Sequence, residues 1–204
     1  PTRKPVRVMN ILGTRPEASK FATVIHALRT LPEPVDLSVC STGQHRQMLD
    51  ATLSAYEIQP DLDLEIMTEG QHITDLFGRL LLKLRPVLDE YQPDTLVVQG
   101  DTTTVAAAAL AGFAAGAKIA HVEAGLRTGD KRAPFPEEMN RRLAGVVADY
   151  HFAPTAQARD NLLAENVPAD RVFLTGNTVV DALYWMRDRV ADLPLPAELA
   201  PQAK

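Results

Sequence analysis

Residues 6–17 have the sequence Val6-Arg7-Val8-Met9-Asn10-Ile11-Leu12-Gly13-Thr14-Arg15-Pro16-Glu17, which gives the clearest local signature of the fold. The β-branched and apolar run from 6 to 12 ends at Gly13, which is typical of a buried strand in a parallel sheet. Pro16 follows at a position that proline favours in the first turn of a helix. A buried strand that passes through a short loop into a helix predicts the first unit of an α/β fold.

The same alternation of strand and helix continues along the chain. We expect further strands over 35–40, 95–98, 118–122, 150–153 and 171–174. Helical patterns cover 16–28, 46–56, 73–91, 102–115, a segment from about 137, 154–163 and 178–190, and Pro86 predicts a kink or a break in the third of them. These elements imply an α/β fold, a Rossmann-like parallel sheet with helices on both faces. We expect one domain over 1–190 and a linker or truncated tail over 191–204.

Composition excludes several classes of protein. The 204 residues carry a net charge of −5, and an acidic balance argues against a broad nucleic-acid interface. The single cysteine, Cys40, excludes a disulfide within the chain and a thiolate zinc site, and no other metal cluster is visible in the sequence. No apolar stretch has the length of a membrane span, and the basic start lacks the long apolar region of a secretory signal. We therefore expect a cytoplasmic protein that binds neither nucleic acid nor membrane.

Small and polar residues follow the strands, where ligands bind in an open parallel sheet. These strand-end loops are Gly13–Glu17, Ser41–Arg46, Gly100–Thr104, Glu123–Asp130 and Gly176–Thr178. Arg15 and Lys20 lie in and just beyond the first turn of the first helix, and a helix N-terminus with two cations suits a phosphate. The alternative is that both are solvated surface charges. The glycine patterns of dinucleotide and P-loop sites are absent, which disfavours both ligands.

Carboxylates lie in the same loops. Asp101 could be a plain helix cap, whereas Glu123 ends a strand and has no obvious capping role. Glu137 and Glu138 fall in the first turn of a helix, where each could simply stabilise the dipole by roughly 0.3–1 kcal/mol. Glu137 is also spaced to pair with Arg141, and only one of the two adjacent glutamates can face a site. Carboxylates beside cations could supply the acid and the base for proton transfer at carbon.

Taken in order, these loops resemble a known family. The matching blocks are Gly13-Thr14-Arg15-Pro16-Glu17-Ala18 with Lys20, Gln44-His45-Arg46-Gln47-Met48-Leu49, Gly100-Asp101-Thr102-Thr103-Thr104, His121-Val122-Glu123-Ala124-Gly125-Leu126-Arg127-Thr128, Pro136-Glu137-Glu138, Asn140-Arg141 and Gly176-Asn177-Thr178. They resemble the bacterial non-hydrolysing UDP-N-acetylglucosamine 2-epimerases, and they cover only the N-terminal domain of that family. Thr23 stands where the family usually has proline, and Gly70 where some members have a regulatory arginine.

The resemblance implies one half of a GT-B-like architecture, in which two Rossmann-like domains form a cleft. It implies the interconversion of UDP-GlcNAc and UDP-ManNAc by elimination and re-addition of UDP, with no cofactor, in cell-surface polysaccharide biosynthesis. It also implies a homodimer of the full-length enzyme and a C-terminal domain that supplies a catalytic histidine and most uridine contacts. The 204 residues alone are then expected to be inactive.

The resemblance also assigns roles to individual residues. Asp101, Glu123 and Glu137 match the catalytic carboxylates of the family, and Arg15, Lys20 and Arg141 match its substrate-binding region. Gln44, Gln47 and Glu138 match part of a regulatory site that binds a second UDP-GlcNAc in some members. Two alternatives stay open at this point. They are a 2-epimerase of a UDP-2,3-diacetamido sugar and a non-catalytic module that binds sugar nucleotides.

Overall fold

A single parallel sheet forms the centre of the molecule. The computed structural model describes residues 4–43, 46–66, 68 and 70–191. Its seven strands lie in the order β3-β2-β1-β4-β5-β6-β7, and every neighbouring pair is parallel. The strands are β1 Val6–Leu12, β2 Val35–Ser41, β3 Leu62–Asp63, β4 Thr95–Gln99, β5 Lys118–Val122, β6 Tyr150–Ala153 and β7 Val172–Leu174. The expected Rossmann-like α/β fold is confirmed.

Strand β3 is absent from the sequence prediction. It has two residues, which pair with the end of β2 through Cys40 with Leu62 and Ser41 with Asp63. Two residues cannot show the period-2 alternation that identifies a strand, so this element depends on its neighbour in the sheet.

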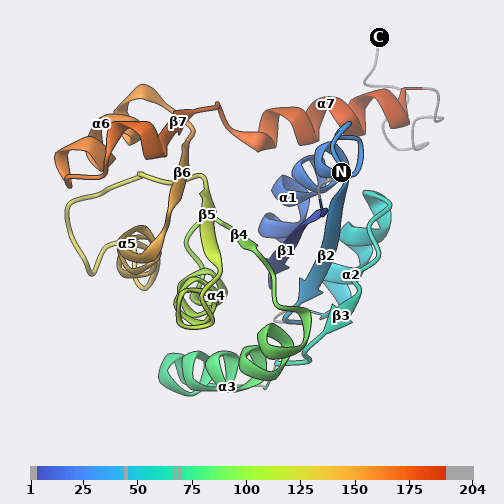
Figure 1. Ribbon diagram of the computed structural model, residues 1–204, viewed down its shortest axis with the longest axis horizontal. Coiled ribbons are helices and arrows are strands. Elements are labelled where there is room, and N and C mark those ends of the chain that lie inside the picture. The colour runs from blue at the N-terminus through green and yellow to red at the C-terminus, as the bar shows by residue number, and fades with distance from the viewer. Residues whose placement is uncertain (1–3, 44–45, 67, 69, 192–204) are drawn as a thin grey trace, which may run out of the picture.

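Helices cover both faces of the sheet (Figure 1). They are α1 Arg15–Arg29, α2 Arg46–Ala55, α3 Ile73–Tyr91, α4 Thr103–Ala114, α5 Glu137–Val147, α6 Ala156–Ala164 and α7 Thr178–Val190, with a 3₁₀ turn at Ala169–Arg171. Apolar side chains of α1, α2 and α7 share one core with the sheet, and those of α3, α4 and α5 share the core on the opposite face. A third, smaller cluster lies under α6 at the β6–β7 edge.

Helix α3 passes through Pro86 as one continuous element, so the predicted break does not occur. Proline leaves the carbonyl of Leu82 without its helical partner. The Leu82 side chain is 75% exposed, and water can reach this side of the helix. Leu80, Leu84 and Leu88 are buried on the opposite side and hold the helix against the sheet. Tertiary packing therefore outweighs the local preference of proline.

Helix α7 crosses over α1 near the end of the described chain (Figure 1). Trp185 stacks on His26 with 5.4 Å between ring centroids, and the Arg189 guanidinium lies 3.3 Å from the centroid of the Trp185 ring. Residues 192–204 lie outside the described residues, so the domain boundary at 190 stays a prediction. Among the described residues, no helix combines the length and apolarity that crossing a membrane requires.

A buried histidine lies in the middle of the sheet. His121 on β5 donates from Nε2 to the carbonyl of Gly100 at 2.7 Å, in the neutral tautomer that this contact favours. Burial lowers the pKa of His121 to about 4, and the hydrogen bond to Gly100 only partly offsets that effect. His151, its register partner on β6, also has a pKa lowered by burial. Both imidazoles are therefore kept neutral by the fold.

The buried His121 makes stability depend on pH. The unfolded chain protonates this residue near pH 6.5, whereas the folded chain does so only near pH 4, so stability is full above pH 6.5 and falls as the pH drops toward 4. We expect His121 alone to remove about 2 kcal/mol of unfolding free energy between pH 7.5 and pH 5. Urea unfolding of the wild type and of His121→Gln at both pH values measures this difference. Equal pH dependence in the two proteins would contradict it.

Candidate active site at the carboxyl ends of the strands

The order of the strands creates the site. β1 lies between β2 and β4, and the loops after these three strands begin side by side at the carboxyl edge of the sheet. After β1 and β2 the chain continues toward β3, whereas after β4 it continues in the opposite direction, toward β5. The loops approach very closely at Gly13. A Cβ atom there would lie 2.4 Å from Thr42 Oγ1 and 2.6 Å from Thr104 Oγ1. Only glycine lets these three segments meet, which brings the loop that carries Arg15 beside the loop that carries Asp101.

Glu123 lies at the centre of one cluster. It follows β5 with φ of 61°, a left-handed conformation that is strained for a non-glycine residue and often marks functional sites. Lys20 Nζ donates to its Oε2 at 2.6 Å, and Gln99 Nε2 donates to the same oxygen. Asn177 Nδ2 donates to Oε1 at 3.3 Å. The structure thus brings Lys20 and Glu123 together and holds the carboxylate from three elements.

Asp101 belongs to a second cluster. The Arg141 guanidinium donates to Asp101 Oδ2, and Asn140 Nδ2 donates to the Asp101 carbonyl at 3.0 Å. The alternative of a plain helix cap does not hold, because Thr102 caps α4 by accepting from the Val105 N–H. The Asp101 side chain keeps 28% exposure, so its carboxylate is both anchored and accessible.

Arg141 forms ion pairs with different residues from the one predicted. The expected pair with Glu137 does not form; instead Arg141 contacts Asp101 and, at 3.3 Å, Glu138. Glu138 is fully buried and also accepts from Arg142 Nε at 3.0 Å and from the Thr128 N–H at 3.2 Å. Burial alone would raise the pKa of Glu138, but these donors and the two arginines outweigh it and lower that pKa. The Asp101 contact across the loops replaces the expected pair along the helix.

Glu137 and Arg15 differ from the other predicted residues. Glu137 begins α5 and is half-buried, and within the described chain its carboxylate makes no recorded hydrogen bond or ion pair. Glu137 and Glu138 therefore point in different directions, as expected for adjacent helical residues. Arg15 begins α1, is exposed, and likewise has no recorded side-chain partner among residues that the structure describes. Both side chains are free to contact a ligand.

The predicted regulatory residues are only partly described. Gln44 and the side chain of Gln47 lie outside the described residues, as does His45. Glu138 is described, and its contacts are those with Thr128, Arg141 and Arg142. The regulatory assignment stays a prediction.

Two supporting residues were missed at the sequence level. Gln99 is the last residue of β4, and Asn177 caps α7 through Oδ1, which accepts from the Val179 N–H at 3.0 Å. Asn177 lies inside the strand-end loop Gly176–Thr178, and Gln99 directly precedes the loop Gly100–Thr104, so their positions in the sequence were the available signal. Their long-range contact with Glu123 depends on the order of the strands, which local sequence patterns do not reveal.

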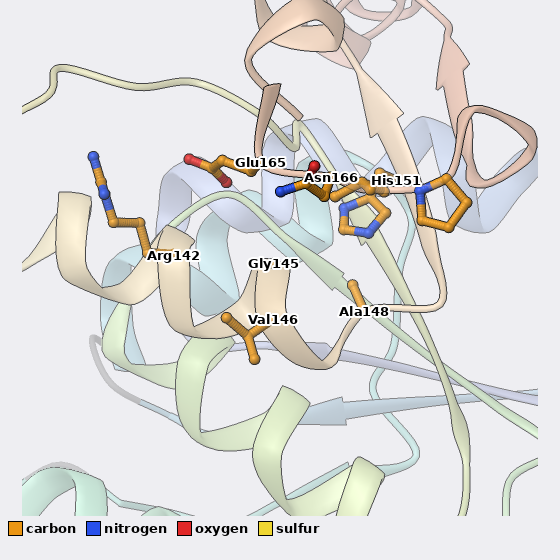
Figure 2. A pocket seen from close by; sticks show the side chains of 9 residues that line it. Arg142, Gly145, Val146, Ala148, His151, Glu165 and Asn166 are labelled. Atoms are coloured by element: carbon orange, nitrogen blue, oxygen red, sulfur yellow. The ribbon is translucent and has the colours of Figure 1, made fainter. Parts of the chain in front are cut away.

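A cavity of about 600 Å³ lies apart from Asp101, Glu123 and Glu137, between α5 and the loop after α6 (Figure 2). Arg142, Gly145, Val146, Ala148, His151, Glu165, Asn166, Val167 and Pro168 line it. None of the predicted catalytic carboxylates is among these residues, although Arg142 links the cavity wall to Glu138. The carboxylates instead lie on the open strand-end surface, beside Lys20 and Arg141. That arrangement can bind an anion and move a proton.

The chain is similar to known proteins over nearly its whole length. The family model described as UDP-N-acetylglucosamine 2-epimerase matches residues 26–202. The UDP-N-acetylglucosamine 2-epimerase of Yersinia pestis is 54% identical over 96% of this chain and 52% of its own length. The chain therefore spans about half the length of the curated relatives it matches.

Solved structures agree in fold. A UDP-GlcNAc 2-epimerase from Neisseria meningitidis, bound to UDP-GlcNAc, is 43% identical, with a TM-score of 0.89 over 97% of this chain and 52% of its own. The UDP-GlcNAc 2-epimerase of Methanocaldococcus jannaschii, in complex with UDP-GlcNAc and UDP, is 34% identical, with a TM-score of 0.87 over 97% of this chain and 53% of its own. These matches confirm the expected half of a GT-B-like architecture. The chain belongs to the UDP-N-acetylglucosamine 2-epimerase family.

Proposed function

We propose that this chain is the N-terminal domain of a non-hydrolysing UDP-GlcNAc 2-epimerase. The observation that supports it most directly is the pairing of Glu123 with Lys20 and of Asp101 with Arg141 at the meeting point of the strand-end loops. Relatives of the same family have been solved with UDP-GlcNAc and UDP bound. A cytoplasmic location and a place in polysaccharide biosynthesis remain part of this proposal.

In the proposed reaction, Asp101, Glu123 and Glu137 surround C2 of the sugar. One carboxylate removes the C2 proton and UDP leaves, which gives a glycal; UDP then adds back while a proton arrives on the opposite face. Arg15 is free to meet the phosphates, and Lys20 supplies positive charge beside Glu123. Arg141 is largely enclosed by Asp101 and Glu138, so we assign it the task of orienting Asp101.

The carboxylates provide the main test. We expect Asp101→Asn and Glu123→Gln each to lower kcat by about 10²–10⁴-fold, because each removes a group that transfers or orients a proton. The measurement is the turnover of UDP-GlcNAc and of a UDP-2,3-diacetamido sugar by the full-length protein. Exposed Glu33→Gln serves as the matched control.

Wild-type rates in both site variants would contradict the assigned roles. Preference for the diacetamido sugar would change the substrate, and tight UDP binding without turnover would favour a binding module. The 204 residues alone are expected to show negligible turnover.

The proposed phosphate contact has its own test. We expect Arg15→Ala to weaken UDP binding by about tenfold, since a charge-assisted hydrogen bond to phosphate contributes roughly 1.5–3 kcal/mol. Titration calorimetry with UDP measures the effect in the complete protein, and Arg29→Ala at the far end of α1 is the matched control. Equal affinity in both variants would exclude Arg15 from the phosphate site.

A second domain is the first proposed partner. Relatives are about twice as long as this chain, which covers 52% of the Yersinia pestis protein. An apolar cavity of about 350 Å³ lies over β4, β5 and β6 beside α1, with Val97, Val122, Tyr150 and Phe152 among its lining residues. Burying such a surface would be favourable. We propose that the remainder of a full-length protein completes the substrate cleft and covers apolar surface of this domain.

A second copy of the protein is the other proposed partner. Leu82 on α3, Phe113 on α4 and Val146 on α5 are well exposed apolar side chains on one face of the molecule. A groove of about 360 Å³ lies between α3 and α4, and Leu81, Leu88 and Leu110 are among the residues that line it. Exposed apolar surface is favourable to bury in an interface, and in the proposed dimer a two-fold axis lets each Phe113 enter the groove of the other copy.

The dimer proposal predicts that Phe113→Glu halves the mass in solution, because it places a charge in the apolar contact. Light scattering coupled to size-exclusion chromatography measures the mass of the complete protein. Leu31→Glu, at an exposed apolar residue away from this face, should keep the dimer. A monomeric wild type, or a dimer that Phe113→Glu leaves intact, would refute the assignment of this face.

A further inference from the structure

Glu17 is a buried carboxylate for which the proposed mechanism has no use. It lies in the first turn of α1, and only 3% of the residue is exposed. Its Oε2 accepts from the N–H groups of Gly13 at 2.8 Å and Thr14 at 2.6 Å. Its Oε1 accepts from the Thr102 hydroxyl at 2.6 Å. Both carboxylate oxygens are therefore bound, and one of the donors comes from a different strand-end loop.

These contacts exceed those of ordinary helix capping. A glutamate at this position commonly reaches back to one backbone N–H of the same helix, and it usually does so at the surface. Glu17 takes a second N–H from Gly13 and spans 85 residues of sequence to reach Thr102. Burial raises the pKa of Glu17 although all of these hydrogen bonds oppose that rise. One buried carboxylate thus holds the Gly13, Thr14 and Thr102 donors together, which capping of α1 alone would not require.

Thr102 connects Glu17 to the catalytic candidates. Its Oγ1 donates to Glu17 and also accepts from the Val105 N–H at 3.3 Å, so one hydroxyl joins α1 to the start of α4. Asp101 is the residue directly before it, and Arg15 is the residue directly after Thr14. Glu17 therefore ties the loop that carries Arg15 to the loop that carries Asp101.

We propose that Glu17 is a positioning residue, which sets the distance between the Arg15 loop and Asp101 through its hydrogen bond with Thr102. This inference rests on the proposed function, since it concerns how that site holds a phosphate and a reacting sugar carbon in register. Small displacements of a reacting group have large effects on rate, whereas ground-state binding through other contacts is little changed. The expected signature is therefore a loss in kcat without a matching rise in KM.

The test compares four variants of the complete protein in UDP-GlcNAc turnover. Glu17→Gln and Thr102→Val should each lower kcat roughly tenfold or more and leave KM within about twofold. Thr102→Ser keeps the hydroxyl and should retain near wild-type kcat. The double variant Glu17→Gln/Thr102→Val should lose less activity than the product of the two single losses, because both changes alter the same contact between Glu17 and Thr102, and the loss of the α4 cap cancels in the coupling energy.

Three results would overturn the inference while the proposed function stands. They are a kcat for Glu17→Gln equal to that of the control Glu33→Gln, equal losses in Thr102→Ser and Thr102→Val, and additive losses in the double variant. If Glu17→Gln does not fold, the comparison of Thr102→Ser with Thr102→Val decides. If the wild type shows no turnover, it is the proposed function that fails. The contact can then be tested by hydrogen exchange, because the Gly13 and Thr14 amide protons should exchange faster in Glu17→Gln than in the wild type.

Discussion

The close approach of three loops at Gly13 is the constraint on which the site depends. Strand β1 has β2 on one side and β4 on the other, so the chain passes from one side of β1 to the other, and the loops after all three strands begin at one edge. Thr42 and Thr104 lie where a side chain at position 13 would have to be. If these loops were farther apart, Glu17 could not reach Thr102, and Asp101 would be displaced from the end of α1. The geometry of the candidate site thus follows from the order of the strands and from one missing side chain.

Ion pairs and hydrogen bonds hold the carboxylates of the candidate site in place. A buried carboxylate is costly unless donors satisfy it, and at this edge Glu17, Glu123 and Glu138 each receive three or more donors. The donors come from α1, β4, α5 and the loops after β1, β4 and β5 and before α7, so each carboxylate connects its own segment to at least one other. Glu137 and Arg15 differ from these carboxylates, because their side chains have no hydrogen-bond or ion-pair partner among the described residues. In the proposed reaction Glu137 and Arg15 meet the substrate as unpaired groups, whereas Asp101 and Glu123 act while their partners hold them in place.

The two apolar surfaces of the molecule suggest that this frame is one part of a larger assembly. One lies over β4, β5 and β6 near α1, and the other lies on the outer faces of α3, α4 and α5. They are on opposite faces of the sheet, so a second domain and a second copy could be accommodated together. The chain covers about half the length of its relatives, which is consistent with the proposal that a second domain completes the cleft.

Sequence patterns alone were enough to predict the class of fold and to place the candidate site at one edge of the sheet. Apolar strands bounded by glycine and proline have a strong local signature, and the carboxyl ends of parallel strands must share an edge, so Arg15, Lys20, Asp101 and Glu123 could be placed there without coordinates. Only the tertiary structure decided which groups pair. Arg141 turns to Asp101 instead of Glu137, Asn177 reaches Glu123 across 54 residues, and the two-residue strand β3 exists only beside β2. These contacts depend on the order of the strands and on the directions of side chains, and local periodicity contains neither.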